Sequence, residues 1–235
     1  MAHLKKDANG HLWKNTAGHL VNDCPEEPPP PPLPCDVWDD FNRADNASLG
    51  PNWTECGSGP LEIANNHCAF QWNGNTGANQ YARAVNVNPV GSNDHQVTVT
   101  LGNWLAGGSN TRQRFNYVCG RHTANDCTGN YYAGYIQSHW GSLHTYHRRK
   151  ILKQQGGWST LAEDTADASL GEWNFKVDGS DLTWWKTGFF GSALTANDSD
   201  IASGQYGGLM FVYYVMTNGG VSGALWADDF CMNTV

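Results

Sequence analysis

The sequence from Cys35 to Val235 is dominated by short segments in which apolar and polar residues alternate, with turn residues between them. The pattern holds in segments 61–72, 80–87, 94–104, 114–122, 130–140, 142–152, 172–188, 206–215 and 223–235. Because successive side chains of a strand point to opposite faces of a sheet, this alternation predicts strands with one buried face. About eleven to thirteen such strands, with no convincing amphipathic helix, indicate an all-β fold built as an antiparallel two-sheet sandwich.

Composition agrees with this fold class and narrows the function. Eleven Trp and 27 Gly, with only 15% charged residues, suit a β-protein with many turns. The net charge is -8 and no long run of Lys or Arg occurs, so the basic patch that a nucleic-acid binder needs is missing. No stretch of 18 apolar residues occurs, so we expect no membrane span.

A proline run, PEEPPPPPLP at 25–34, divides the chain. Such a run enters neither a helix nor a central strand and favours polyproline II, which gives a stiff spacer of about 30 Å. The sequence therefore predicts an arm over 1–24, a polyproline linker over 25–34 and a sandwich over 35–235. A ligand for a signalling domain is the competing interpretation of the run, but nothing else in the sequence resembles signalling.

The arm is an octapeptide repeat, HLKKDANGHLWKNTAGHLVND at 3–23, in which His-Leu recurs every eight residues. Each unit offers a short strand and a turn that ends in Gly, where a positive φ costs little. Strands this short bury nothing alone, so we expect them to pair with a partner's sheet or with sibling copies. The residues expected to anchor the arm are Leu4, Leu12, Trp13, Leu20 and Cys24.

The cysteine content conflicts with the N-terminal sequence. Seven cysteines are typical of an oxidising compartment, yet MAHLKKDANG has no apolar core of the signal-peptide type. A phage virion protein resolves the conflict, because it assembles in the bacterial cytosol and meets oxidising conditions after lysis. The alternative is that the thiols are simply buried and reduced. The cysteines are Cys24, Cys35, Cys56, Cys68, Cys119, Cys127 and Cys231.

Three segments carry a resemblance to a known family. DVWDDFNRADNASLGPNWTE (36–55) is similar to the opening of concanavalin A-like jelly-roll domains, GEWNFKVDGSDLTWWKTG (171–188) resembles their late hairpin, and YGGLMFV with ALWADDFCM (206–212 and 224–232) resembles their last two strands. The resemblance spans 36–235 and implies a jelly-roll sandwich. Domains of this type occur in lectins, in laminarinase-like glycosidases and in phage head and tail proteins.

The resemblance also implies that the first and last strands are neighbours. It would bring the two Asp-Asp-Phe motifs together, and it implies a structural Ca²⁺ bound by Asp228 with help from Asp40; the alternative is that these carboxylates cap turns. The same adjacency implies a disulfide between Cys35 and Cys231.

The remaining cysteines suggest two more disulfides. Cys119 and Cys127 flank a loop short enough to be bridged, and Cys56 and Cys68 flank another. These pairs leave Cys24 over, which could bridge two chains, so we expect a homo-oligomer.

The carboxylates that glycosidases of this fold need are missing. Those enzymes carry Glu-x-Asp-x-x-Glu on one strand, and none of the six Glu residues here belongs to such a pattern. We therefore expect no enzyme activity. A laminarinase-like hydrolase is the least favoured alternative.

Sugar binding fits the sequence better. Aromatic rings stack on the apolar faces of sugars while polar side chains bind the hydroxyls. In jelly rolls of this type the middle strands form a concave face, although about half of the rings must instead fill the core. The candidate carbohydrate-binding residues are Tyr131, Tyr135, Gln137, His139, Trp140, Tyr146 and Trp158.

Together these features predict a phage virion structural protein, either a capsid decoration, a fibre or a tail appendage. The arm would bind capsid or tail proteins, and the sandwich would face outward on the virion surface and adhere to surface glycans. The alternative from another class is a non-catalytic carbohydrate-binding module that acts outside the cell, which explains the sandwich and the cysteines but not the repeat.

Overall fold

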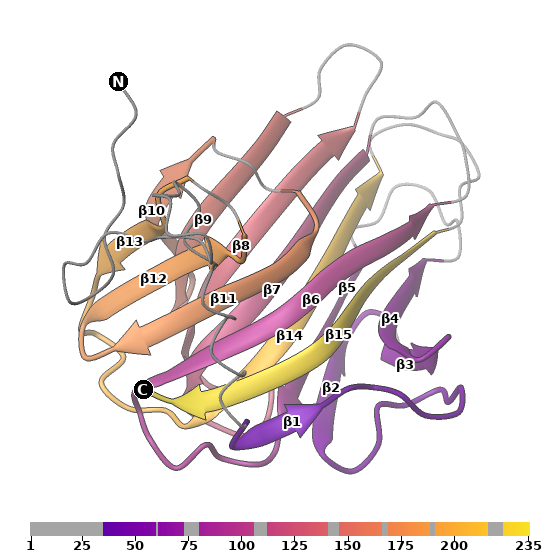
Figure 1. Ribbon diagram of the computed structural model, residues 1–235, viewed down its shortest axis with the longest axis horizontal. Helices are drawn as coiled ribbons and strands as arrows, with labels where there is room; N and C mark the ends of the chain where they lie inside the picture. Colours follow the sequence, from indigo (N-terminus) through magenta and orange to yellow (C-terminus); the bar gives the residue numbers. More distant parts are fainter. Residues whose placement is uncertain are drawn as a thin grey trace, which may run out of the picture. The chain divides into compact units, whose positions relative to one another are not determined.

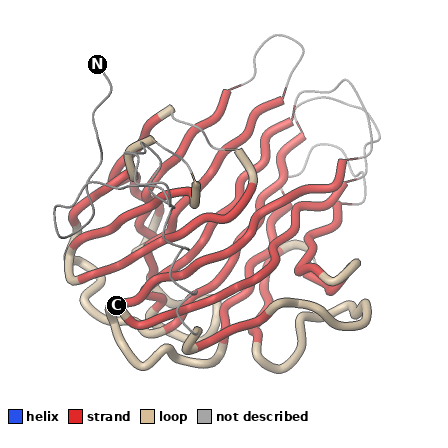
Figure 2. The backbone as a smooth tube through the Cα atoms, viewed as in Figure 1, coloured by secondary structure: helices blue, strands red, loops and turns tan. Residues whose placement is uncertain are grey.

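The computed structural model describes residues 35–59, 61–72, 80–105, 112–140, 146–165, 169–188, 191–215 and 223–235. The predicted arm with its anchoring residues, and the predicted linker, lie outside the described residues. All regular structure in the described part is β-strand, as Figure 2 shows. No helix in this part is long and apolar enough to cross a membrane.

The first sheet has eight strands and is formed by segments far apart in the sequence. Its order is β13 (Leu194–Asn197), β12 (Asp181–Lys186), β11 (Gly171–Asp178), β6 (His95–Leu105), β15 (Gly223–Thr234), β4 (His67–Trp72) and β3 (Leu61–Ala64). The short strand β1 (Val37–Asp39) also pairs with β15, next to the chain's C-terminus (Figure 1).

The second sheet has seven strands and packs against the first. Its order is β10 (Trp158–Asp164), β9 (Tyr146–Gln154), β8 (Tyr131–Trp140), β7 (Arg112–His122), β14 (Tyr206–Val215), β5 (Gln80–Asn86) and β2 (Trp53–Gly57). Every neighbouring pair in both sheets is antiparallel. The predicted all-β, antiparallel two-sheet sandwich is confirmed.

The core lies between the sheets and consists of the inward half of each alternating strand. Trp173 and Trp184 stack within it with ring centroids 4.7 Å apart, and both are fully buried. Trp184 fits because Gly134 of the opposite sheet has no side chain; a Cβ there would lie 2.3 Å from the indole. At this position the sheets can approach closely around a large ring because the facing residue is glycine.

Two of the strands have no clear signal in the sequence. Strand β10 pairs with β9, but its register shifts between Thr160 and Ala162, so the face that its side chains occupy changes partway along. A bulge of this kind breaks the period of two on which the prediction depends. Strand β13 has four residues and lies at a sheet edge, which is too short for the alternation to be recognised.

Candidate functional site

The outward face of the seven-stranded sheet is the surface that the sequence predicts to bind sugar. On β8, Tyr132 and Ile136 belong to the core between the sheets. Because side chains alternate, Tyr131, Ala133 and Tyr135 lie on the other face. Tyr131 and Ala133 pack there with Cys119 of β7 and with the partly buried Tyr117, in a cluster separate from the core.

Five aromatic rings on this face contact one another across β7, β8 and β10. Trp158 lies 5.6 Å from Tyr117 and 5.7 Å from Tyr131, between ring centroids. Tyr135 lies 4.8 Å from Tyr117 and 5.7 Å from Phe115. We call this group the aromatic platform; it consists of Phe115, Tyr117, Tyr131, Tyr135 and Trp158.

The rings of the platform have different roles because they differ in exposure. Trp158 is 49% exposed, whereas Tyr131 and Tyr135 are 1% and 5% exposed. Trp158 can therefore offer a ring face to a ligand, while Tyr131 and the partly buried Tyr117 contact and support its ring. The small residues Cys119 and Ala133 are fully buried, which leaves room for the large rings around them.

Charged groups border the platform on β9 and β10. The register places Tyr135 beside Lys150, and Lys150 beside Glu163. The Lys150 Nζ atom lies 6.0 Å from the Tyr135 ring centroid. The two Glu163 oxygens pair with Arg148 at 2.9 Å and with Lys150 at 3.1 Å, and these cations, Lys150 first, lower the pKa of the carboxyl group. Such groups can bind sugar hydroxyls at the edge of a stacked ring.

The structure places the predicted sugar-binding residues only in part. Tyr131, Tyr135, Gln137 and Trp158 lie on or beside the platform, but the first three are buried. His139, Trp140 and Tyr146 lie in β8 and β9, and their side chains are outside the described part of the structure. Phe115 and Tyr117 were not among the predicted residues, although the alternation in RFNYVCGRH (114–122) gives both the same face.

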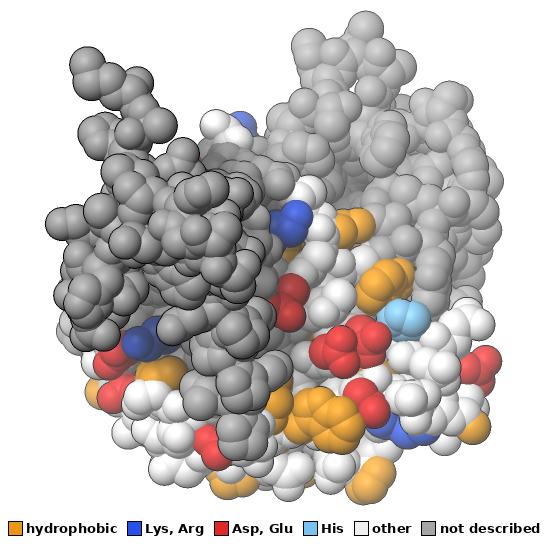
Figure 3. Space-filling model, viewed as in Figure 1, with side chains coloured by type: hydrophobic (Ala, Val, Ile, Leu, Met, Phe, Trp, Pro, Cys, Tyr) orange, Lys and Arg blue, Asp and Glu red, His pale blue; other side chains and the backbone are white. Residues whose placement is uncertain are grey.

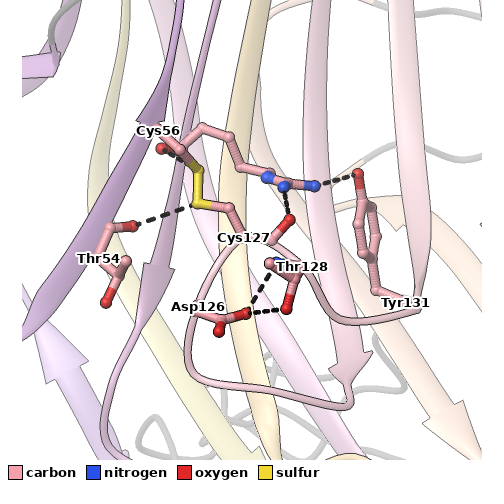
Figure 4. The surroundings of a disulfide bond; sticks show 7 residues. Thr54, Cys56, Asp126, Cys127, Thr128 and Tyr131 are labelled. Carbon is pink, nitrogen blue, oxygen red and sulfur yellow. Dashed lines mark hydrogen bonds between the residues drawn. A yellow bond between two sulfur atoms is a disulfide. The ribbon is translucent and has the colours of Figure 1, made fainter.

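A disulfide joins the edge of this sheet to the loop between β7 and β8 (Figure 4). Cys56 of β2 is bonded to Cys127, with Cα atoms 6.4 Å apart. Both predicted pairings of these cysteines, with Cys68 and with Cys119, are wrong. Cys68 is buried in the core from the other sheet, and Cys119 lies beneath the platform; both are free thiols.

The predicted disulfide between Cys35 and Cys231 is confirmed. The Cα atoms lie 5.4 Å apart, and the two residues are separated by 196 positions in the sequence. Next to it, Val37 pairs with Met232 and Asp39 with Phe230. The resemblance to jelly-roll domains therefore identified the neighbouring first and last strands correctly.

The two Asp-Asp-Phe motifs meet at this junction, where acidic side chains gather on the face that Figure 3 shows. Strand β15 bulges after Asp228 against β6, and Asp229 has a φ of 51°. The His67 Nε2 atom lies 3.8 Å from Asp228. Residues lining a shallow pocket of about 380 Å³ here are Asp40, Asn42, Asn65, Asn66, His67, Asp228 and Asp229.

No protein-family model matches the chain, and no curated protein matches it. Solved structures do. The CBM2 module of the evolved Dit of Lactobacillus casei BL23 phage J-1 superimposes with a TM-score of 0.59 at 14% identity, over 86% of this chain and 96% of that one. The exoplasmic/lumenal domain of VIP36, in its Ca²⁺- and Man3GlcNAc-bound form, superimposes with a TM-score of 0.51 at 13% identity, over 84% of this chain and 92% of that one. The domain has a lectin-type, concanavalin A-like jelly-roll fold.

Within this lectin-type fold, the junction pocket offers the oxygen donors that Ca²⁺ prefers, from carboxylates and amides. Burial raises the pKa of Asp228, and the negative charge of Asp229 adds to the effect, so a cation would relieve repulsion there. Among the described residues, however, no group of three or more His, Cys, Asp or Glu side chains is arranged as a metal centre. The donor chemistry fits Ca²⁺, and a site formed by Asp40 and Asp228 stays a prediction.

Proposed function

We propose that the sandwich is a non-catalytic glycan-binding domain and that the aromatic platform is its binding surface. One observation carries the proposal: the half-exposed ring of Trp158 is held against the buried Tyr131 and the partly buried Tyr117, with charged side chains beside the platform. A stacked sugar would remove the apolar face of this ring from water, which is favourable. The lectin-type neighbours support the same class of ligand, since the VIP36 domain is bound to Man3GlcNAc.

The proposal that the domain binds without cutting rests on the carboxylates. A glycosidase needs one carboxyl group that keeps its proton near neutral pH. Glu163, beside the platform, has both oxygens in ion pairs and a lowered pKa, so it stays ionised. The sequence has no Glu-x-Asp-x-x-Glu pattern that would supply another pair.

Replacing Trp158 by Ala removes the ring on which the sugar stacks and should weaken glycan binding more than tenfold. A tenfold loss corresponds to about 1.4 kcal/mol of binding free energy. Retention on immobilised β-glucan, mannan, galactan and host surface polysaccharide, followed by calorimetry, measures the effect. Trp38→Ala is the matched control, since Trp38 is 58% exposed on β1 of the other sheet. Equal binding by the Trp158→Ala protein, or release of reducing ends by the wild type, would contradict the proposal.

We further propose that the chain is a phage virion protein whose arm binds capsid or tail proteins. The repeat and the proline run support this role, as does the fold shared with a module of a phage Dit protein. The second candidate is a carbohydrate-binding module that acts outside the cell. The two disulfides suit either protein, because both meet oxidising conditions.

Deleting residues 1–24 separates these two candidates. The truncated protein should keep its melting temperature, because all described strands lie after Cys35, yet it should be absent from assembled particles. Mass spectrometry of purified virions, with and without the deletion, gives the copy number. Incorporation of the truncated protein at normal copy number would show that the arm is not the anchor.

The Ca²⁺ proposal has its own test. If Asp40 and Asp228 bind Ca²⁺, the ion stabilises the folded state by about 2.7 kcal/mol at a hundredfold excess over its dissociation constant. A chelator should then lower the melting temperature by several degrees, and Asp228→Asn should abolish that response. Identical melting curves with and without chelator, together with no calcium in elemental analysis, would count against the site.

A further inference from the structure

We propose that the Cys56–Cys127 disulfide holds the aromatic platform in its binding geometry, with Arg83 as the residue that transmits the restraint, so that glycan affinity depends on oxidation. The expected change in glycan affinity rests on the proposed function. The expected change in the position of the Trp158 ring does not depend on it.

The first step is the loop between β7 and β8, which forms a compact unit. Thr123 N donates to Asn130 O at 2.9 Å, so the two ends of the loop are close. Asp126 accepts from the backbone and hydroxyl of Thr128 at 2.8 and 2.7 Å. Cys127 therefore lies in an ordered turn, and its bond to Cys56 attaches that turn to β2 at the edge of the sheet (Figure 4).

The second step is Arg83 of β5, which contacts both the loop and the platform. The register pairs it with Cys56. One guanidinium nitrogen donates to the carbonyl oxygen of Cys127, and the other donates to the Tyr131 hydroxyl at 2.9 Å. Its Nε atom is buried and has no partner in the part of the chain that the structure describes. The Cys127 carbonyl is therefore one of the two acceptors that position this guanidinium.

The third step leads from Arg83 to the exposed ring. The guanidinium carbon lies 5.3 Å from the centroid of the Tyr131 ring, so it fixes the ring as well as its hydroxyl. Tyr131 also stacks on His122 at 4.8 Å, and it meets the Trp158 ring in a T-shaped arrangement at 5.7 Å. Burial and the charge of Arg83 lower the pKa of His122 to about 4, so the histidine stays neutral beside the cation.

Breaking the disulfide should therefore loosen the platform. A released loop takes the Cys127 carbonyl away, and a partly buried guanidinium then lacks an acceptor, which is costly. Arg83 would turn toward solvent and Tyr131 would lose its restraint, which leaves Trp158 with a mobile support. A ligand would then have to order the rings as it binds, and its affinity would fall.

The oxidation balances with a low-molecular-weight disulfide of the surrounding medium as the oxidant. The thiolate of Cys56 or Cys127 attacks RSSR and displaces one RSH, and the second cysteine then displaces the other, which forms the protein disulfide. Two cysteine thiols are oxidised and one RSSR is reduced to two RSH. Burial raises the pKa of the nearby Cys119 thiol to about 12, so it does not compete as a nucleophile.

The experiment uses the full chain and three variants. Cys56→Ser/Cys127→Ser removes the disulfide, and Arg83→Met keeps the disulfide but removes the hydrogen bonds from Arg83 to the Cys127 carbonyl and to Tyr131. Cys35→Ser/Cys231→Ser is the control that removes the other disulfide. The first readout is acrylamide quenching of Trp158, taken as the difference from the same protein with Trp158→Phe. The second is affinity for whichever of β-glucan, mannan or galactan the wild type retains best.

Both test variants should show faster quenching of Trp158 and about tenfold weaker binding, which corresponds to roughly one buried hydrogen bond. The control should keep both values. Unchanged quenching in the Arg83→Met protein would overturn the inference, whether or not the double serine variant folds. If the oxidised wild type binds none of the polysaccharides, the proposed function fails, and the quenching result alone decides whether the disulfide sets the ring.

Discussion

Removing the Cys35–Cys231 disulfide with the double serine variant should lower the free energy of unfolding by about 5 kcal/mol. The bond closes a loop of 196 residues, and in the chain-entropy model the restraint on the unfolded state grows with loop length. The Cys56–Cys127 bond, which closes 71 residues, should contribute slightly less, about 4 kcal/mol. Denaturant unfolding, with the midpoint and slope fitted for each variant, measures both values.

The folded state gives a second reason to expect a large effect. Strand β1 has only three residues and pairs only with β15 among the described strands. Beyond the disulfide, Asp36 accepts from the backbone and hydroxyl of Thr234 at 2.8 and 3.0 Å. If the variant loses less than about 1 kcal/mol, these contacts alone hold the ends of the sandwich, and the staple is not a main source of stability.

Asp39→Ala should be the most damaging single substitution in the DDFNRAD segment, at about 3 kcal/mol. Asp39 is 8% exposed and accepts four hydrogen bonds. It binds Arg43 through both oxygens, at 2.6 and 3.1 Å, and the Trp53 indole nitrogen at 2.7 Å. Removing it leaves the buried indole nitrogen of Trp53 without its acceptor and the partly exposed guanidinium of Arg43 with only the Leu49 carbonyl, and an unsatisfied buried donor is costly.

The neighbouring aspartate supplies a matched control. Asp40 accepts from the backbone of Asn42 at 3.0 Å, in an exposed turn, so Asp40→Ala in the presence of a chelator should cost less than about 1 kcal/mol. Thermal unfolding of both variants gives the comparison. Equal losses in the free energy of unfolding for the two variants would mean that the hydrogen bonds to the Asp39 side chain are not what stabilises this segment.

The role of Asp39 also explains why this segment could be recognised. Arg43 and Trp53 both donate to Asp39, and Arg43 also binds the Leu49 carbonyl at 2.7 Å. Phe41 has a φ of 52° and is fully buried. The spacing of residues in DDFNRADNASLGPNW thus reflects one local hydrogen-bond network around Asp39. Local networks are visible in a sequence because their members are near one another along the chain.

The aromatic platform could be predicted only in part. Alternation places Tyr117 on one face of β7 and both Tyr131 and Tyr135 on one face of β8, but it does not say which rings stay exposed. The exposure of each ring depends on which side chains pack over it. Trp158 belongs to β10, which is separated from β8 by β9, yet its ring lies 5.6 Å from that of Tyr117. The sequence therefore predicted that Tyr131 binds sugar directly, whereas in the structure its ring is buried and supports Trp158.

The sequence by itself determined most of the strands and their antiparallel class, because these depend on the period of side chains along the chain. The meeting of the two ends followed from the resemblance of the DDFNRAD segment and the last strands to jelly-roll domains. Only the tertiary structure decided that Cys56 bonds to Cys127, that Cys68 and Cys119 stay free, and that Arg83 joins the disulfide to the platform. These partners come from segments far apart in the sequence. Their distances are fixed only when the two sheets form, with the order of strands and the path of the loop between β7 and β8.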